Sequence, residues 1–276
     1  MPLDTYFFVL AYVLLGLGSG FIGGLLGIGG GVIIVPVLYV LFSITDIYPA
    51  QLSLLVALAT SLSCIVFTSA SAAIAQIRGG RVQWASALKL LPFLLLGGAV
   101  SGYIAPLLPI DLLRYMLAAF LGCVAVIMFV SWKPKPQRTL PGLIGCAPIG
   151  IGAGTVSGLA GIAGGNVIVP TLIYFNMPPH LAAATSSALG TPLAAVAALS
   201  YFLSAPAVST AATDAASAHG NLYGYVDVWA FVCIVVGAIC TAPIGVKFAQ
   251  RVPAETLKKC FALLLTLVAA RMLLSP

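Results

Sequence analysis

One apolar segment occurs twice in this chain, once in each half. Residues 16–38 read GLGSGFIGGLLGIGGGVIIVPVL, and residues 150–172 read GIGAGTVSGLAGIAGGNVIVPTL. The copies start 134 positions apart and are identical at 13 of 23 positions. Each copy is interrupted by glycines and then by a proline, both of which disfavour a regular helix. Two apolar segments broken at corresponding positions of two halves are typical of membrane transporters, in which the breaks mark the binding site.

The rest of the chain is equally apolar. Of the 276 residues, 61% are hydrophobic and 7% are charged, whereas an average soluble domain has about 25% charged residues. Long apolar runs separated by short polar gaps are typical of a helical integral membrane protein. The sequence therefore predicts an all-α polytopic membrane protein whose surroundings are membrane lipid.

The net charge of +6 comes from basic residues dispersed in short loops. Such residues set membrane topology, and they do not form the continuous basic surface of a nucleic-acid partner, so we expect no nucleic acid. The six cysteines lie in apolar segments without a C-x-x-C pair. We interpret them as packing residues, with a thiol role as the alternative, and expect no metal site and no cofactor.

Apolar segments divide the chain into two repeats and a linker. The first repeat, residues 1–132, contains segments 6–28, 32–42, 52–77, 86–108 and 112–132. The second repeat, residues 142–276, contains segments 142–162, 166–176, 181–204, 228–250 and 256–274. The stretch 133–141 between them is basic and proline-rich.

The second segment of each repeat is too short to cross a membrane. Segments 32–42 and 166–176 have 11 residues each, which reach ~16 Å at ~1.5 Å per residue, about half of a ~30 Å hydrocarbon core. We therefore expect each to form a hairpin with its predecessor, over 6–42 and 142–176, which enters the membrane and turns back near the glycines.

Three clusters of basic residues test how the segments are threaded, because cytoplasmic loops are enriched in Lys and Arg. They occupy 78–84, 133–141 and 251–259. With a hairpin plus three spans in each half, all three fall on one side, which we assign to the cytoplasm, and both termini fall outside. With four plain spans in each half, the third cluster lies opposite the others, so the hairpin arrangement is favoured.

The hairpin arrangement turns the second repeat upside down relative to the first. The two glycine breaks then enter from opposite faces and meet near the middle, as in many secondary transporters. The expected fold is two inverted structural repeats, each a re-entrant or broken-helix hairpin plus three transmembrane helices. An error of one segment in this count would make the repeats parallel.

The glycine breaks are the first candidates for a ligand site. Non-helical backbone inside a membrane persists only where protein buries it or where it lines a wet cavity. A helix that begins there presents free N–H groups and a positive dipole end, which bind anions without any lysine. The glycines assigned to substrate binding are Gly29, Gly30, Gly31, Gly164 and Gly165.

The other repeated glycines have a structural interpretation. Spaced four residues apart, they form a ridge that lets helices approach closely. We expect packing at Gly16, Gly20, Gly24, Gly150, Gly154 and Gly158. Pro36 and Pro170, each five residues past its glycine pair, are also expected to be structural.

A second repeated motif places hydroxyl groups in both halves. Ala59-Thr60-Ser61 corresponds to Ala184-Thr185-Ser186 in the span that follows each hairpin. Hydroxyls inside a bundle either bind substrate or join helices, and their paired placement favours binding. The further site candidates are therefore Thr60, Ser61, Thr185, Ser186 and Asn166. Asn166 follows Gly165 where the first copy has Val32, and its amide is either a helix cap or a ligand donor.

Acidic groups are scarce in the predicted spans. Asp111 and Glu255 lie at helix starts, and Asp227 falls in the loop 205–227, so no carboxylate proton relay is visible. Coupling would then use the substrate's own titration, or hydroxyls and backbone, or be absent. The G-x-G-x-x-G match at 18–23 lies inside a span rather than after a strand, and no catalytic residue is assigned, so we expect no enzyme.

The quoted motifs resemble those of the sulfite exporter TauE/SafE family of membrane permeases. The likeness rests on the doubled glycine and Val-Pro segment, on Ala-Thr-Ser in each following span, and on the ending Ala249-Gln250-Arg251-Val252-Pro253 with Leu257-Lys258. It implies transport of sulfite, sulfoacetate or other organosulfonates across the bacterial cytoplasmic membrane, commonly outward. The chain departs from internal symmetry at Ala163 for Gly29 and at Asn166 for Val32.

The sequence thus predicts a secondary transporter that exports a small sulfur-containing anion across the inner membrane. The anion would be held at the midplane between the two broken hairpins. The alternative is a channel-like anion pore in which the hairpins form a filter.

Overall fold

The computed structural model describes residues 3–26, 30–130, 140–205, 222–249 and 254–274. The first half contains α1 (Leu3–Leu26), α2 (Gly31–Thr45), α3 (Ala50–Arg78), α4 (Trp84–Ile104), η1 (Ala105–Leu107) and α5 (Ile110–Phe129). The second half contains α6 (Cys146–Leu159), α7 (Gly165–Tyr174), α8 (Pro179–Ser204), β1 (Leu222–Tyr223), β2 (Val226–Asp227), α10 (Val228–Ala249) and α11 (Ala254–Leu274). Each apolar segment expected from the sequence contains one α-helix, and segment 86–108 also contains η1, which confirms the all-α prediction.

Length and composition make this a multi-pass membrane protein. Four described helices are long and apolar enough to cross a bilayer, at Leu52–Arg78, Trp84–Leu107, Ile110–Phe129 and Pro179–Ser204. By contrast, α2 has 15 residues and α7 has 10. At ~1.5 Å per residue they reach only ~22 Å and ~15 Å, so both are too short to cross a ~30 Å core.

Two features of the second half differ from the expectation. Helix α6 begins at Cys146 rather than at residue 142, because residues 142–145 form a turn in which the Cys146 N–H donates to the Gly142 carbonyl at 3.1 Å. The segment before α10, expected to be a loop, ends in a short antiparallel hairpin that pairs Leu222 with Asp227 and Tyr223 with Val226.

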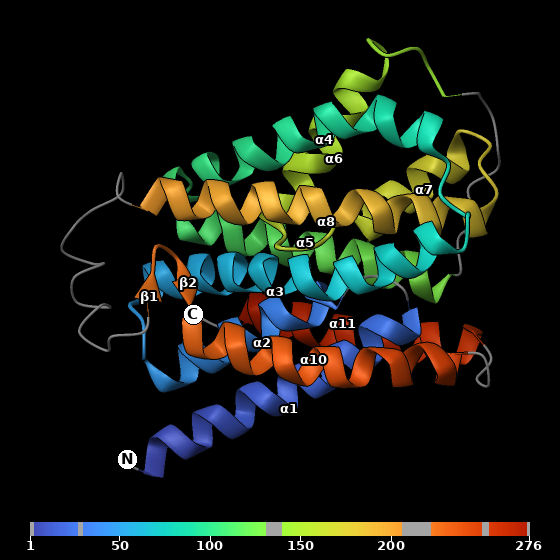
Figure 1. The fold of residues 1–276 in the computed structure, drawn as a ribbon. Coiled ribbons are helices and arrows are strands. Elements are labelled where there is room, and N and C mark those ends of the chain that lie inside the picture. The colour runs from blue at the N-terminus through green and yellow to red at the C-terminus, as the bar shows by residue number, and fades with distance from the viewer. Residues whose placement is uncertain (1–2, 27–29, 131–139, 206–221, 250–253, 275–276) are drawn as a thin grey trace.

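Most helices, among them α3, α4, α8 and α10, run roughly along one direction, and both chain termini lie at the end that carries β1 and β2 (Figure 1). Helices of one half pack on helices of the other. Helix α1 packs along α10, α6 along α4, α3 along α8, and α5 along α11. The two halves are therefore interleaved rather than placed side by side as separate domains.

Glycine seams permit the closest of these contacts. A Cβ atom at Gly16 would lie 2.8 Å from the Ile234 Cα of α10, and one at Gly154 would lie 3.0 Å from the Gly98 N of α4. Hydroxyl groups join the same two seams, because Thr241 donates to the Leu17 carbonyl at 2.8 Å and Thr155 donates to the Gly97 carbonyl at 3.3 Å. The packing role expected of the glycine ridge is confirmed at Gly16 and Gly154.

Helix α3 lies at the centre of the bundle. Its side chains Leu54, Leu58 and Leu62 are fully buried, and so are Thr60 and Ser61 between them. A hydroxyl at this depth needs a protein partner or a ligand. The hydrogen bonds of α3 in the interior therefore show which of its hydroxyls already have a protein partner.

Candidate functional site

The two glycine turns adopt the same backbone conformation. Gly30 has φ 74° and ψ −18°, and Gly164 has φ 77° and ψ −6°, a left-handed geometry that glycine adopts at no steric cost. Each turn precedes a half-helix: the Gly30 carbonyl accepts from Ile33 N–H, and the Gly164 carbonyl accepts from Val167 N–H. The breaks thus create helix N-termini at α2 and α7, while the candidate Gly29 lies outside the described residues.

The fold brings the two halves together at these turns. Ser61, on α3, donates to the Gly161 carbonyl at 2.9 Å. A Cβ atom at Gly31 would lie 3.0 Å from the same carbonyl oxygen. The candidates Gly31 and Ser61 of the first half therefore contact the glycine break of the second half.

Three buried polar atoms beside α7 have no hydrogen-bond partner among the described residues. They are Asn166 Nδ2, Ser157 Oγ and Ser186 Oγ. A Cβ atom at Gly164 would lie 3.2 Å from Ser157 Oγ, and Ser186 lies on α8, which packs against α7. Leaving buried donors unsatisfied costs about 1–3 kcal/mol each, so Asn166 Nδ2 and Ser157 Oγ make the α7 turn the candidate place for a ligand with acceptor oxygens.

Ser157 was not among the candidates from the sequence. It lies in the repeated segment where the first copy has Gly23. It is fully buried, and it lies against the N-terminal turn of α7. Comparing the copies position by position for polar replacements, as was done for Asn166, would have identified it.

The two candidate threonines are engaged by backbone of the opposite half. Thr60 Oγ1 accepts the Asp227 N–H at 3.0 Å, directly before α10. Thr185 Oγ1 accepts the Gln83 N–H at 3.0 Å, directly before α4. Each threonine thereby holds the start of a helix from the other half.

The two turns differ in polarity. Around Gly30 the nearest atom to an added Cβ is the Ser19 carbonyl oxygen, at 2.8 Å, and Gly31 faces the apolar Ile65. Val32 stands where α7 has Asn166. Side-chain donors therefore gather at the α7 turn.

Asp227, which the sequence places in the loop 205–227, lies at the end of β2 directly before α10. It is buried there, with 3% of its surface exposed. Tyr48 O–H donates to its Oδ2 at 2.8 Å, and Ala230 N–H donates to its Oδ1 at 3.0 Å. Burial raises the pKa of the Asp227 carboxyl, against the opposing effect of these hydrogen bonds.

The raised pKa of Asp227 predicts how stability depends on pH. The folded protein holds this proton more tightly than the unfolded chain, whose carboxyl has the ordinary pKa of 3.8. The Asp227 contribution to stability is therefore complete below pH 3.8 and is lost as pH rises through the folded-state pKa. Thermal unfolding across this range should show a smaller fall of Tm in Asp227→Asn than in wild type, whereas the exposed Asp46→Asn should keep the wild-type slope. Equal slopes in all three proteins would contradict the assignment.

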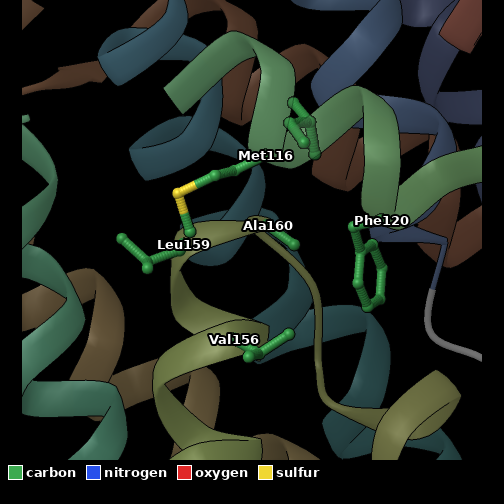
Figure 2. A pocket seen from close by; sticks show the side chains of 6 residues that line it. Met116, Phe120, Val156, Leu159 and Ala160 are labelled. Carbon is green, nitrogen blue, oxygen red and sulfur yellow. The ribbon is translucent and has the colours of Figure 1, made fainter. Parts of the chain in front are cut away.

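An apolar pocket lies beside the second glycine break (Figure 2). It is lined by Met116, Leu117, Phe120, Val156, Leu159 and Ala160. These side chains, from α5 and from the end of α6, carry no charged or hydrogen-bonding group apart from the weakly accepting sulfur of Met116. The pocket therefore has no means of holding an anion, and the polar atoms at the α7 turn remain the candidate site.

Comparisons with known proteins agree on one class. A family model described as sulfite exporter TauE/SafE matches residues 12–272. A probable membrane transporter protein of Haemophilus influenzae is 31% identical over 97% of this chain and 98% of its own length. The probable membrane transporter protein YdhB of Bacillus subtilis is 29% identical over 96% of this chain and 98% of its own length. No solved structure matches the chain.

Proposed function

The chain belongs to the sulfite exporter TauE/SafE family of membrane transporters, and we propose that it exports a small sulfur-containing anion across the bacterial cytoplasmic membrane. The substrate class is sulfite or an organosulfonate such as sulfoacetate. The observation that carries this proposal is the pair of unpartnered buried atoms at the N-terminal turn of α7, Asn166 Nδ2 and Ser157 Oγ, with Ser186 Oγ on the adjacent helix α8 also unpartnered.

The chemistry of these groups suits a sulfur oxyanion. Sulfite and sulfonate groups present three oxygens that accept hydrogen bonds, and amide and hydroxyl groups donate them. The first N–H groups of α7 lack intrahelical acceptors, and the helix dipole favours negative charge there. A site of neutral donors binds such an anion without a lysine or arginine, as expected from the sequence.

Several contacts support an inverted arrangement of the two halves. Packing of α1 on α10 corresponds to packing of α6 on α4, and Thr60 and Thr185 make equivalent contacts to helix starts. Helix α2 lies toward the end that carries the termini, and α7 lies toward the opposite end (Figure 1). In this proposal the basic loops 78–84, 133–141 and 251–259 face the cytoplasm, although residues 131–139 and 250–253 lie outside the described part.

The contact between the turns supports a carrier over an open pore. The hydrogen bond from Ser61 to Gly161 and the packing of Gly31 on Gly161 close the space between the halves at this point. A carrier opens such a site to each side in turn, which predicts saturable counterflow of sulfite or sulfoacetate in proteoliposomes. A single-channel conductance in planar bilayers would instead support the channel-like pore.

A binding experiment tests the α7 site directly. Sulfite and sulfoacetate should raise the Tm of the purified protein, since a ligand that binds only the native state stabilises it by about 2.7 kcal/mol at 100 times its Kd. Asn166→Val, which introduces the residue of the first copy, should remove most of that shift because it deletes the amide donor.

A second variant in the same helix serves as the control. Thr171→Val also replaces a residue of α7 by its first-copy counterpart, Val37. The Thr171 hydroxyl donates to the Val167 carbonyl within the helix, so its loss should leave the anion shift intact. A shift that survives in Asn166→Val, or that disappears equally in both variants, argues against the proposed site.

A further inference from the structure

Asp227 occupies a junction of several elements rather than a loop. Its backbone N–H donates to Thr60 on α3, one carboxylate oxygen accepts from Tyr48 between α2 and α3, and the other accepts from Ala230 in the first turn of α10. Tyr12 of α1 lies near this carboxyl. The carboxylate and backbone N–H of Asp227 thus connect the α2–α3 connection and α3 to the start of α10.

The groups that face this carboxyl include no cation among the described residues. The titratable groups around it are Tyr12 on α1, Tyr48, Cys64 on α3 and Cys233 on α10. None of them is positively charged at neutral pH. A buried carboxylate without a cation is costly, and the usual response is to bind a proton rather than to keep the charge.

The equivalent position in the other half has no such group. Gln83 directly precedes α4 as Asp227 precedes α10, and its N–H binds Thr185 as that of Asp227 binds Thr60. Gln83 is exposed and neutral. The fold therefore accepts an amide-bearing residue at this junction. A buried carboxyl is not required to hold the start of the helix, so the carboxyl of Asp227 is specific to the second half.

We propose that Asp227 is the proton-binding residue through which transport is linked to a proton gradient. This inference rests on the proposed transport function and adds the coupling ion to it. A proton from the aqueous phase binds a carboxylate oxygen in one conformation. It is released to water in the other conformation, so that one O–H bond forms and the same bond breaks in each cycle.

A continuous set of contacts links this proton to the glycine turn of the first half. Protonation removes charge from an acceptor that holds Tyr48 and the start of α10. Helix α10 packs along α1, with Gly16 against Ile234. On α1, Ser19 in turn lies against Gly30 at the start of α2. A shift of the start of α10 would thus be transmitted through the closely packed backbone of α1 to the turn at Gly30.

Two transport measurements on the full-length protein in liposomes separate coupling from anion movement. The first is counterflow of sulfoacetate at equal pH on both sides, and the second is uphill accumulation of sulfoacetate driven by a pH gradient. Sulfoacetate is used because its sulfonate keeps its charge near neutral pH. Wild type should show both, and with the membrane potential held at zero its accumulation should approach about tenfold per pH unit for one-for-one coupling.

Asp227→Asn should keep counterflow within about twofold of wild type and lose the gradient-driven accumulation, because an amide binds no proton in this range. Asp46→Asn, the same chemical change at an exposed site, should retain both activities. Accumulation in Asp227→Asn that matches wild type, or a wild type that ignores the pH gradient, would overturn the inference.

Two further measurements keep the proton inference testable if Asp227→Asn fails to fold or if the transport proposal is wrong. Tyr48→Phe removes one hydrogen bond to the carboxylate, so the pH of half-maximal accumulation should move upward. Infrared titration of the protein without any anion should show a protonated carboxyl band that disappears at higher pH. Absence of counterflow in wild type would sink the anion proposal alone. Absence of a titrating carboxyl band, or an unchanged pH of half-maximal accumulation in Tyr48→Phe, would contradict the proton inference alone.

Discussion

Gly164→Val is expected to abolish anion binding and to reduce counterflow by about tenfold or more. The left-handed conformation costs an L-residue about 1–2 kcal/mol, a factor of about 5–30 in an equilibrium. Gly164 has φ 77°, and an added Cβ would lie 2.8 Å from Ile168 Cδ1 and 3.2 Å from Ser157 Oγ. The variant therefore strains the α7 turn and displaces a hydroxyl assigned to the site. Counterflow of sulfite and sulfoacetate, together with their effect on Tm, measures the loss.

Gly152→Ala is the matched control for this substitution. It lies in α6 within the same repeated segment, and an added Cβ meets no atom within 4 Å. Alanine at a helical glycine gains about 0.5–1 kcal/mol, so this variant should be as active as wild type and slightly more stable. Intact anion binding in Gly164→Val would show that the helix-terminus site is wrong.

The second large effect is expected at the seam between α4 and α6. In Gly154→Val, the added Cβ would lie 3.0 Å from Gly98 N and 3.1 Å from Gly97 Cα. Backbone atoms of a neighbouring helix cannot move aside as a side-chain end can. Overpacking of this kind costs about 1–3 kcal/mol and occasionally more, a large share of the 5–15 kcal/mol that typically stabilises a protein. The yield of monodisperse protein and its Tm should both fall sharply.

Gly122→Val separates this steric effect from the general effect of placing valine in a helix. Gly122 lies in α5, and an added Cβ there has nothing within 4 Å. Its yield and Tm should remain near wild type. A Gly154→Val protein as stable as Gly122→Val would mean that α4 and α6 do not approach as closely as described.

The two glycine variants also fail in different ways. Gly154→Val should lose folding and anion binding together, because the seam holds in place α6, the helix that also carries Ser157. A folded Gly164→Val protein should lose anion binding at a near-normal yield, since the strain is confined to one turn. This difference tests whether the repeated glycines divide into a packing ridge and a site, as their spacing indicates.

The outline of the fold was predictable from local sequence. Apolar runs placed the helices, and the glycine breaks separated α1 from α2 and α6 from α7, since hydropathy and backbone freedom act over a few residues. The turn at residues 142–145 and the β1–β2 hairpin were missed, because both lie in short segments whose pattern does not distinguish a turn from the surrounding element.

The sequence by itself determined that two apolar segments are broken by glycines and that the second break is followed by an amide-bearing residue, Asn166. Only the tertiary structure decided which polar groups are engaged and which lack a partner. Ser61 meets Gly161 across 100 positions, Thr185 meets Gln83 across 102, and Tyr48 meets Asp227 across 179. A hydrogen bond between residues so distant in the chain depends on how helices pack. For that reason no local pattern could place Asp227 in the interior or leave Ser157 without a partner.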